Sequence, residues 1–345
     1  MRACVIHGAG DLRVEDVADG APREGEVEVG VSLGGICGSD LHYFHRGGVG
    51  DFRVREPMVL GHEIVGVVSA VGAGVETPRP GEAVAVHPAT VCGACPECLA
   101  GRRNLCRNVL YLGSAARMPH VQGGFRERLV IPAEQARPLP PGLAPERAVL
   151  AEPFAVGLHA IARAGDVTDR RVLVTGAGPI GCLVVAAARA VGAAEIVVSD
   201  LLDEPLELAR RLGATATLRA DDEDRAGWPD ELDVTVEASG APAGLRACVE
   251  RVRRGGVVVA LGMQPPGEVP FLGNVVVTRE IDVRGAFRFD VEFDRALELL
   301  AGGLDLDPLV TAWVPLDDAR EAFELAGDRR RASKVLLEVG GPSGR

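Results

Sequence analysis

Four cysteines gather in one short segment of the sequence, at a spacing that is typical of zinc sites. The segment reads C-x2-C-x2-C-x7-C. Four thiolates on so short a lobe can surround one tetrahedral Zn2+ and leave no open position, which is the arrangement of a structural site. Disulfides, unused thiols and an iron–sulfur cluster are the alternatives, but nothing else in the sequence indicates an electron carrier. The predicted ligands are Cys92, Cys95, Cys98 and Cys106.

A second set of possible metal ligands is spread along the first half of the chain. Cys37 lies in the stretch 34–42, His62 and Glu63 are adjacent, and Glu152 precedes a proline. Each residue alone is a weak signal, since a lone cysteine is usually a small buried hydrophobe. Together they offer a soft thiolate, a borderline imidazole and two hard carboxylates, all of which Zn2+ accepts. A catalytic zinc site uses three protein ligands and keeps one position open, so these residues are candidates for it.

A glycine motif follows at residues 172–181, where Val-Leu-Val-Thr leads into Gly-Ala-Gly-Pro-Ile-Gly. The pattern G-x-G-x-x-G is weak alone, but here an expected strand precedes it and an expected helix follows it, as dinucleotide binding requires. The first glycine permits a tight turn, the second lets the backbone approach a pyrophosphate, and the third lets the helix pack closely on the strand. The candidate cofactor-binding residues are Gly176, Gly178, Pro179, Ile180 and Gly181.

Asp200 ends the next expected strand, near the spacing of about 20 residues at which an acid binds the cofactor ribose. A carboxylate there accepts hydrogen bonds from ribose hydroxyls and repels a 2′-phosphate. Residues 201–204 contain no Arg or Lys that could hold such a phosphate. The sequence therefore predicts NAD rather than NADP as the cofactor. A glycine-rich turn without a ligand is the alternative.

The elements that must position these residues change character near residue 152. Before it, β-rich runs such as 26–31, 64–70 and 83–87 are separated by Gly and Pro, which indicates a barrel-like β domain. After it, strands and helices alternate between residues 171 and 283, which predicts a parallel sheet covered on both faces. We expect the tail to return to the first domain. The predicted fold class is therefore α/β, with a β-barrel domain and a doubly wound parallel-sheet domain.

Length, charge and composition exclude other classes of protein. The chain has 345 residues, 47% of them apolar, which is enough for two cores. The formal net charge of −12 repels phosphate backbones, so we expect no nucleic-acid partner. The apolar runs are too short to span a bilayer, and the N-terminus does not read as a signal peptide. We therefore expect a cytoplasmic protein with no membrane partner.

Taken in order along the chain, these motifs resemble those of the zinc-containing medium-chain dehydrogenases. The resemblance rests on Gly-Gly-Ile-Cys-Gly-Ser-Asp-Leu-His, Gly-His-Glu, the four-cysteine lobe, Glu-Pro and Gly-Ala-Gly-Pro-Ile-Gly, and it spans the whole chain. It implies a GroES-like catalytic zinc domain at residues 1–153 and 288–345. It further implies an inserted Rossmann NAD-binding domain at residues 154–287. Members of this family form homo-oligomers, so a dimer or tetramer is also implied.

The resemblance assigns a metal role to four residues outside the lobe. It implies that Cys37, His62 and Glu152 bind a catalytic Zn2+. Glu63 falls on a neighbouring acid that can enter the metal shell or act through water. Which of the two glutamates touches the metal at rest is left open.

Within this family the chain is most similar to the polyol branch, because Glu152 stands where the ethanol-oxidising branch has Cys. Segments 57–60, 119–125 and 285–289 further resemble the L-idonate 5-dehydrogenases, which interconvert L-idonate and 5-keto-D-gluconate. The implied substrate is a small polyol or aldonate that is oxidised at a secondary alcohol. Sorbitol- or xylitol-type and threonine-dehydrogenase-like enzymes are the alternatives. A quinone reductase or a non-enzymatic member of the superfamily is a more remote alternative, since both should lack the catalytic zinc ligands.

The remaining candidates are residues expected to serve the substrate. Ser39 and His42 fall on positions that relay the alcohol proton to solvent, and a packed or solvated histidine is the alternative for His42. Arg is the natural planar partner of an aldonate carboxylate. The resemblance places Arg288 at the substrate. Arg117 and His120 lie on the loop after the zinc lobe and are further candidates, with a solvated surface charge as the alternative for Arg117.

Overall fold

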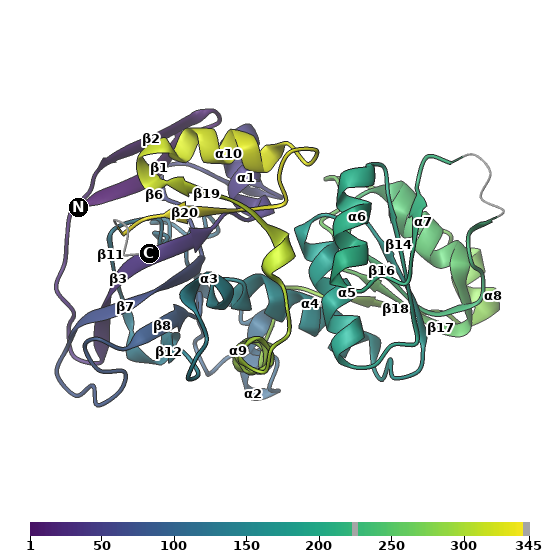
Figure 1. Cartoon of the computed structure of the whole chain (residues 1–345), viewed down its shortest axis with the longest axis horizontal. Coiled ribbons are helices and arrows are strands. Elements are labelled where there is room, and N and C mark those ends of the chain that lie inside the picture. The colour runs from purple at the N-terminus through teal and green to yellow at the C-terminus, as the bar shows by residue number, and fades with distance from the viewer. Residues whose placement is uncertain (223–226, 341–345) are drawn as a thin grey trace. The chain divides into compact units, whose positions relative to one another are not determined.

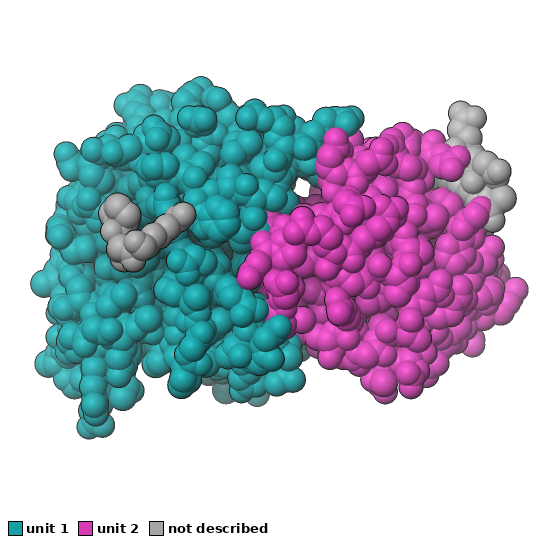
Figure 2. Space-filling view, in the orientation of Figure 1, with its two compact units in different colours: residues 1–152, 293–303, 310–345 teal, residues 153–292, 304–309 magenta. Residues whose placement is uncertain are grey.

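The computed structural model describes residues 1–222 and 227–340, and the chain forms two compact units (Figure 2). Unit 1 comprises Met1–Glu152, Phe293–Gly303 and Val310–Arg345, whereas unit 2 comprises Pro153–Glu292 and Leu304–Leu309. The C-terminal segment thus belongs to the same unit as the N-terminal half. The expected boundaries at residues 153 and 288, and the roles given to the two domains, stay predictions.

Unit 1 is built around a seven-stranded sheet in the order β12-β8-β7-β3-β20-β19, with β11 also pairing with β3. All pairs in it are antiparallel except β19 with β20. Alternation in β3 explains its place in the sheet, since Val27, Val29 and Val31 are buried while the residues between them are partly exposed. These valines belong to a single large core that also includes Phe125 and Phe323.

Shorter elements complete unit 1. Strands β2, β1 and β6 form a second sheet, and the pairs β9–β10 and β4–β5 are small hairpin-like ladders. Helix α10 packs against α1, β2 and β20, as Figure 1 shows. The strands are β1 (Arg2–Gly8), β2 (Asp11–Asp16), β3 (Glu26–Gly35), β4 (Gly48–Val49), β5 (Phe52–Arg53), β6 (Met58–Val59), β7 (Glu63–Val71), β8 (Ala83–Val86), β9 (Ala89–Thr90), β10 (Leu110–Tyr111), β11 (Arg128–Pro132), β12 (Ala136–Pro138), β19 (Val310–Pro315) and β20 (Lys334–Glu338).

The helices of unit 1 are short, and two others cross its boundary with unit 2. The boundary helices are α4 (Ala151–Ala164) and α9 (Glu292–Ala301). Those within unit 1 are α1 (Gly38–Arg46), α2 (Pro96–Leu99), α3 (Pro145–Ala148), α10 (Ala319–Gly327) and the 3-10 turns η1 (Arg103–Leu105), η2 (Ala133–Gln135) and η5 (Leu316–Asp318).

Unit 2 is a six-stranded, all-parallel sheet in the order β15-β14-β13-β16-β17-β18. Figure 1 shows α5 and α6 on one face of the sheet and α7 and α8 on the other. Burial on both faces explains the nearly continuous apolar strands of this unit. The strands are β13 (Arg171–Thr175), β14 (Glu195–Asp200), β15 (Ala216–Arg219), β16 (Leu232–Glu237), β17 (Val252–Ala260) and β18 (Asp282–Gly285).

The strand order places a topological switch point between β13 and β16, because the chain winds outward in opposite directions from these two strands. Ligands of such sheets bind outside the carboxyl ends of the strands at this point. The helices of unit 2 are α5 (Pro179–Ala190), α6 (Asp203–Leu212), α7 (Pro242–Arg251), α8 (Gly273–Arg279) and the turn η4 (Asp307–Leu309).

The predicted fold class is confirmed: a β domain and a doubly wound parallel sheet are both present. Among the described residues, every helix is too short or too polar to cross a bilayer.

Candidate functional site

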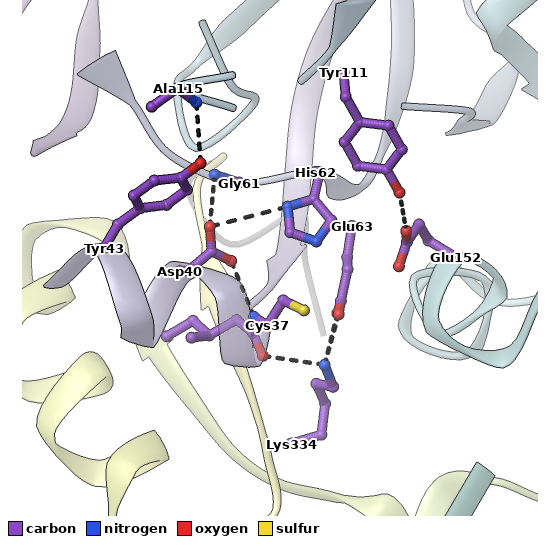
Figure 3. Close-up of polar contacts among 11 residues, drawn as sticks. Cys37, Asp40, Tyr43, Gly61, His62, Glu63, Tyr111, Ala115, Glu152 and Lys334 are labelled. Atoms are coloured by element: carbon purple, nitrogen blue, oxygen red, sulfur yellow. Dashed lines mark hydrogen bonds and ion pairs between the residues drawn. The ribbon is translucent and has the colours of Figure 1, made fainter. Parts of the chain in front are cut away.

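A mixed cluster of possible metal ligands lies within unit 1. One ligand atom each from Cys37, His62 and Glu63 lies within 4.8 Å of the other two. Cys37 is the N-cap of α1, directly after β3, and His62 and Glu63 come from the start of the neighbouring strand β7. The pairing of β3 with β7 therefore brings together residues that are far apart in the sequence. Figure 3 shows the three side chains converging.

Asp40 connects the two backbone segments that carry Cys37 and His62. Its carboxylate is fully buried and accepts hydrogen bonds from the backbone N–H of Cys37 (3.0 Å) and of Gly61 (3.4 Å). The imidazole of His62 faces the same carboxylate, with Nδ1 3.9 Å from Asp40 Oδ1. At 3.9 Å this is an electrostatic contact rather than a hydrogen bond, and it places a carboxylate on the Nδ1 side of the ring. A ligating histidine commonly has such a carboxylate beside the ring nitrogen that does not bind the metal. The sequence analysis missed Asp40, although its place three residues after an N-cap is a known capping signal.

Glu63 is held by a buried lysine that the sequence analysis also missed. Lys334 Nζ lies 2.7 and 2.8 Å from the two carboxylate oxygens of Glu63, and donates to the carbonyl of Ile36 at 3.0 Å. Both side chains are almost fully buried. Gly35 on β3 pairs with Glu63 on β7, and a Cβ there would come within 2.0 Å of Glu63 Oε2. The absence of a side chain at Gly35 therefore leaves space for the Glu63 carboxylate that pairs with Lys334.

Glu152 lies outside the compact trio and has a different partner. Its Oε1 accepts a hydrogen bond from the hydroxyl of Tyr111 at 2.6 Å, as Figure 3 shows. Tyr111 also packs against the imidazole of His62, with ring centroids 5.7 Å apart. The structure therefore groups Glu63, rather than Glu152, with Cys37 and His62, while Glu152 stands beside them. The assignment of either glutamate as a ligand stays a prediction.

Burial and charge oppose each other throughout this cluster. Burial by itself lowers the pKa of His62, but Asp40 and Cys37 raise that pKa well above its usual value. Burial raises the pKa of Glu152 to about 7, although His62 acts in the opposite direction. Burial lowers the pKa of Lys334, but Glu63 reverses the effect and raises it. Such concentrated charge in a buried place is typical of functional sites.

The donor chemistry of the cluster fits Zn2+. A thiolate, an imidazole and a carboxylate are the three donor types that Zn2+ takes in proteins. Three ligands from one trio leave a coordination position for a substrate, which is the pattern of a catalytic rather than a structural site.

The four-cysteine lobe forms the second candidate metal centre. The sulfur atoms of its cysteines all lie within 4.8 Å of one another, and Cys106 and Cys92 are 3.5 Å apart. Backbone N–H groups of Ala94 and Cys95 lower the pKa of Cys92 to about 6, which favours the thiolate that zinc binds. Four sulfurs in this arrangement fit a closed tetrahedral site. The cysteines are Cys92, Cys95, Cys98 and Cys106.

The candidate relay residues both lie on α1. Ser39 and His42 are half-buried and three positions apart, so they occupy one face of the helix. Burial lowers the pKa of His42, and the nearby charges of Arg46 and His45 lower it further. Their role in proton transfer stays a prediction.

The candidate substrate residues differ in how they are engaged. Both ring nitrogens of His120 face backbone groups: Nε2 lies 2.9 Å from the N–H of Arg55, and Nδ1 lies 2.7 Å from the carbonyl of Arg117. His120 is also buried. Roles for His120 and Arg117 at the substrate stay predictions. The guanidinium of Arg117 donates to the carbonyl of Arg107. Arg288 belongs to unit 2, where its guanidinium lies 4.7 Å from the ring centroid of Phe287.

The glycine motif of unit 2 has the geometry of a dinucleotide turn. Gly176 directly follows β13 and has a φ of 90°, and a Cβ there would lie 2.7 Å from the backbone of Ser239. Gly181 faces the carbonyl of Gly176, which a Cβ would approach to 1.9 Å. Gly178 is the N-cap of α5, and no protein atom lies within 4 Å of a Cβ built on it. A side chain at Gly178 would therefore reach only into the space that a ligand needs, while Pro179 and Ile180 open the helix.

Asp200 lies beside this motif at the end of β14. It is buried, and its carboxylate accepts hydrogen bonds from the N–H of Ala177 (2.7 Å) and of Leu202 (3.1 Å). These bonds place the acid at the turn that should hold the cofactor. Each carboxylate oxygen can accept more than one hydrogen bond, so they do not prevent binding of a ribose hydroxyl.

A second buried carboxylate, Glu237, occupies the switch point itself and was not predicted. It ends β16 directly opposite Thr175 of β13. Its Oε1 accepts hydrogen bonds from the N–H groups of Ser239 and Gly240 (2.7 and 2.8 Å) and from the Ser239 hydroxyl (2.5 Å). Its Oε2 accepts one from the amide of Gln264 at 2.9 Å. Glu237 thus anchors the loops that follow β16 and β17, and the first of these loops adjoins Gly176.

Comparison with known proteins identifies a known family in the N-terminal part of the chain and another in the part that contains the parallel sheet. Residues 23–141 match the alcohol dehydrogenase GroES-like domain, and residues 179–302 match the zinc-binding dehydrogenase family. The chain is 38% identical over 341 residues to L-idonate 5-dehydrogenase (NAD(P)(+)) of Escherichia coli, covering 97% of this chain and 98% of that protein. It is 36% identical over 333 residues to sorbitol dehydrogenase of Bacillus subtilis, covering 94% and 93%.

The crystal structure of L-idonate 5-dehydrogenase from Escherichia coli superimposes with a TM-score of 0.93 at 37% identity, over 98% of this chain and 97% of that one. The predicted resemblance to the zinc-containing medium-chain dehydrogenases is confirmed, and so is the prediction that the protein depends on zinc. The chain belongs to the zinc-binding alcohol dehydrogenase family and is an oxidoreductase of the polyol and alcohol dehydrogenase type.

Proposed function

We propose that this protein oxidises a secondary alcohol of a sugar acid with NAD, and that its substrate is L-idonate, which becomes 5-keto-D-gluconate. The buried cluster of Cys37, His62 and Glu63 is the observation that carries the proposal. Hydride leaves a carbinol readily only when its oxygen carries negative charge. A Zn2+ held by Cys37, His62 and Glu63 would act as a Lewis acid and make a substrate hydroxyl far more acidic.

The chain's own residues keep the cluster ready for this chemistry. The Asp40 carboxylate lies 3.9 Å from His62 Nδ1, so Nε2 of that ring would be the nitrogen available to a Zn2+. Lys334 neutralises Glu63 and fixes its position, while Tyr111 fixes Glu152 on the other side of His62. With Glu63 in the resting ligand set, Glu152 is left to act through water or to exchange with it.

The alcohol proton must reach solvent from a site that excludes water. We assign this transfer to Ser39 and His42 on α1. A ribose hydroxyl of the bound cofactor would supply a further donor and acceptor for it. Because burial and neighbouring cations lower the pKa of His42, its imidazole is neutral at physiological pH and can accept the proton.

NAD is the proposed hydride acceptor and binds at the glycine motif of unit 2. The N–H groups at the start of α5 would bind its pyrophosphate, and Asp200 would accept hydrogen bonds from its adenosine ribose. The carboxylate of Asp200 disfavours a 2′-phosphate. The Escherichia coli relative carries NAD(P)(+) in its name, so a measurable use of NADP is compatible with this assignment.

The choice of an aldonate depends on recognition of a carboxylate. Arg288 has a backbone φ of 54°, a conformation that is uncommon for a side-chain-bearing residue and is found at functional positions. A guanidinium is the natural planar partner of a carboxylate, so Arg288 is the proposed contact. The second candidate function is that of a sorbitol-type enzyme, because sorbitol dehydrogenases share nearly the same identity with this chain.

Steady-state kinetics with L-idonate, sorbitol, xylitol and L-threonine, each with NAD and with NADP, test the proposal. We expect the highest kcat/KM for L-idonate with NAD. Sorbitol or xylitol as the best substrate would support the second candidate, and L-threonine would overturn both. Arg288→Ala should raise the KM for L-idonate far more than that for sorbitol. Equal effects would remove Arg288 from carboxylate recognition.

We also propose that the chain forms a homo-oligomer, either a dimer or a tetramer, as the family resemblance implies. Light scattering coupled to size-exclusion chromatography measures the mass directly. A monomer at micromolar concentration would contradict this part of the proposal.

A further inference from the structure

An arginine stands beside the ribose-binding acid at the edge of the parallel sheet. Arg219 is the last residue of β15, and it pairs in register with Asp200, the last residue of β14. Both residues therefore lie at the carboxyl ends of their strands, which is the edge where such sheets bind dinucleotides. Residues 201–204 contain no cation, and Arg219 follows Asp200 only 19 residues later in the sequence, so strand pairing alone brings the two together.

Two carboxylates hold the guanidinium of Arg219. Asp221 binds it in a bidentate manner, with Nε 3.0 Å from Oδ1 and Nη2 2.8 Å from Oδ2. Asp203 approaches from another element, with Oδ2 3.1 Å from Nη1. Asp203 is the first residue of α6, so its carboxylate occupies a helix N-terminus that would also favour a phosphate. The arrangement places two anions where the two oxygens of a phosphate could bind.

These ion pairs are open to competition because they lie in solvent. The side chains of Arg219, Asp203 and Asp221 are 39%, 78% and 52% exposed. Ion pairs so exposed are weak and screened by salt. A phosphate, by contrast, carries close to two charges and matches the planar fork of a guanidinium. A phosphate brought to this edge by a bound dinucleotide can therefore displace one or both carboxylates.

We propose that Arg219 is a specificity-determining residue for the cofactor: it binds the 2′-phosphate of NADP, and Asp203 and Asp221 compete with that phosphate for the guanidinium. This inference rests on the proposed binding of a dinucleotide at the glycine motif. With both acids in place, the negative charge around the ribose outweighs the one cation, and NAD is preferred. Arg219 provides the remaining affinity for NADP.

The acids also offer a direct way to change the preference. Neutralising Asp203 and Asp221 leaves Arg219 opposite Asp200 alone, so the penalty for a 2′-phosphate falls while the contacts with NAD stay unchanged. A charge-assisted contact between arginine and phosphate corresponds to about a tenfold change in affinity. We expect a gain of that order in the double variant.

Calorimetric titration of the full-length, zinc-loaded protein tests this with two fragments. Adenosine 2′,5′-bisphosphate carries the 2′-phosphate, and adenosine 5′-monophosphate lacks it. Asp203→Asn combined with Asp221→Asn should tighten binding of the bisphosphate about tenfold and leave that of the monophosphate unchanged. Adding Arg219→Gln to this variant should abolish the gain. Arg219→Gln alone should weaken the bisphosphate and spare the monophosphate.

A matched control removes the same charge elsewhere in unit 2. Asp230 and Asp282 have exposed side chains that pair with Arg251 and Arg284. They lie at the amino ends of β16 and β18, away from the carboxyl ends where Arg219 lies. Asp230→Asn with Asp282→Asn should leave the bisphosphate affinity unchanged. A gain equal to that of the test variant would show a general charge effect and overturn the proposal.

The remaining outcomes separate this inference from the proposed function. Unchanged bisphosphate affinity in the Asp203→Asn and Asp221→Asn variant, with normal binding of the monophosphate, would overturn the role of Arg219 alone. A gain that persists after Arg219→Gln would overturn it as well. Failure of the wild-type protein to bind the monophosphate or NADH would instead contradict dinucleotide binding at this motif.

Discussion

The two candidate metal centres of unit 1 are built in opposite ways. The four-cysteine lobe takes all its ligands from one segment, which contains only short elements such as α2 and η1. The mixed cluster takes its ligands from the ends of β3 and β7 and is supported by a lysine 271 residues away from Glu63. The lobe has little core of its own, so its metal must hold it together. The mixed cluster is held in place by the sheet, so a metal bound there is not needed for folding and can act in catalysis.

Loss of a ligand from the mixed cluster should give the largest effect on activity. Cys37→Ala removes the thiolate, and we expect kcat/KM to fall by at least about 1,000-fold, since Lewis-acid assistance is worth several kcal/mol. The free energy of unfolding should change little by comparison, because the surrounding sheet is complete without the metal. Activity within tenfold of wild type would contradict this view of the cluster.

Breaking the support of the cluster should give the largest effect on stability. Lys334→Met leaves Glu63 buried without its cation, and the loss of one partner from a buried ion pair costs about 3–5 kcal/mol. Chemical denaturation measures this change. Lys334→Arg is the matched control, since it keeps the charge and should retain more of the stability. A loss under about 1 kcal/mol for Lys334→Met would show that the pair does not support the fold.

Loss of a ligand from the lobe should act locally and more weakly. Cys98→Ser opens the closed site, and we expect proteolysis within residues 92–106 to accelerate roughly tenfold, because the local segment then unfolds more often. The rest of the chain should keep its resistance to proteolysis. Limited proteolysis followed by mass spectrometry locates the cuts. Cuts spread evenly over unit 1 would contradict a purely local role.

The smallest expected effect concerns the proton path. His42→Gln should slow alcohol oxidation far less than the loss of a zinc ligand does, and it should flatten the dependence of the rate on pH. As pH falls through the lowered pKa of His42, the wild-type imidazole becomes charged and can no longer accept a proton, so the rate declines on the acid side. Glutamine has no such transition. An unchanged pH profile of the hydride-transfer step would remove His42 from the relay.

The same contrast explains what the sequence could reveal. Functional residues that are close in the sequence form a recognisable spacing pattern, so the four-cysteine lobe and the glycine motif could be predicted. The parallel sheet could be predicted from the alternation of strands and helices. Lys334 carries no local signal, since only the pairing of β20 with β3 brings it to Glu63. Arg219 was missed for the same reason: it adjoins Asp200 across two parallel strands rather than along the chain.

The central claim is that the chain holds one metal for structure and another for chemistry, and counting zinc in matched variants tests it most directly. We predict about two zinc ions per wild-type chain, about one in Cys37→Ala, and about one in Cys98→Ser. Only the second of the two variants should retain dehydrogenase activity. A wild-type chain with a single zinc ion that Cys37→Ala also keeps would contradict the account.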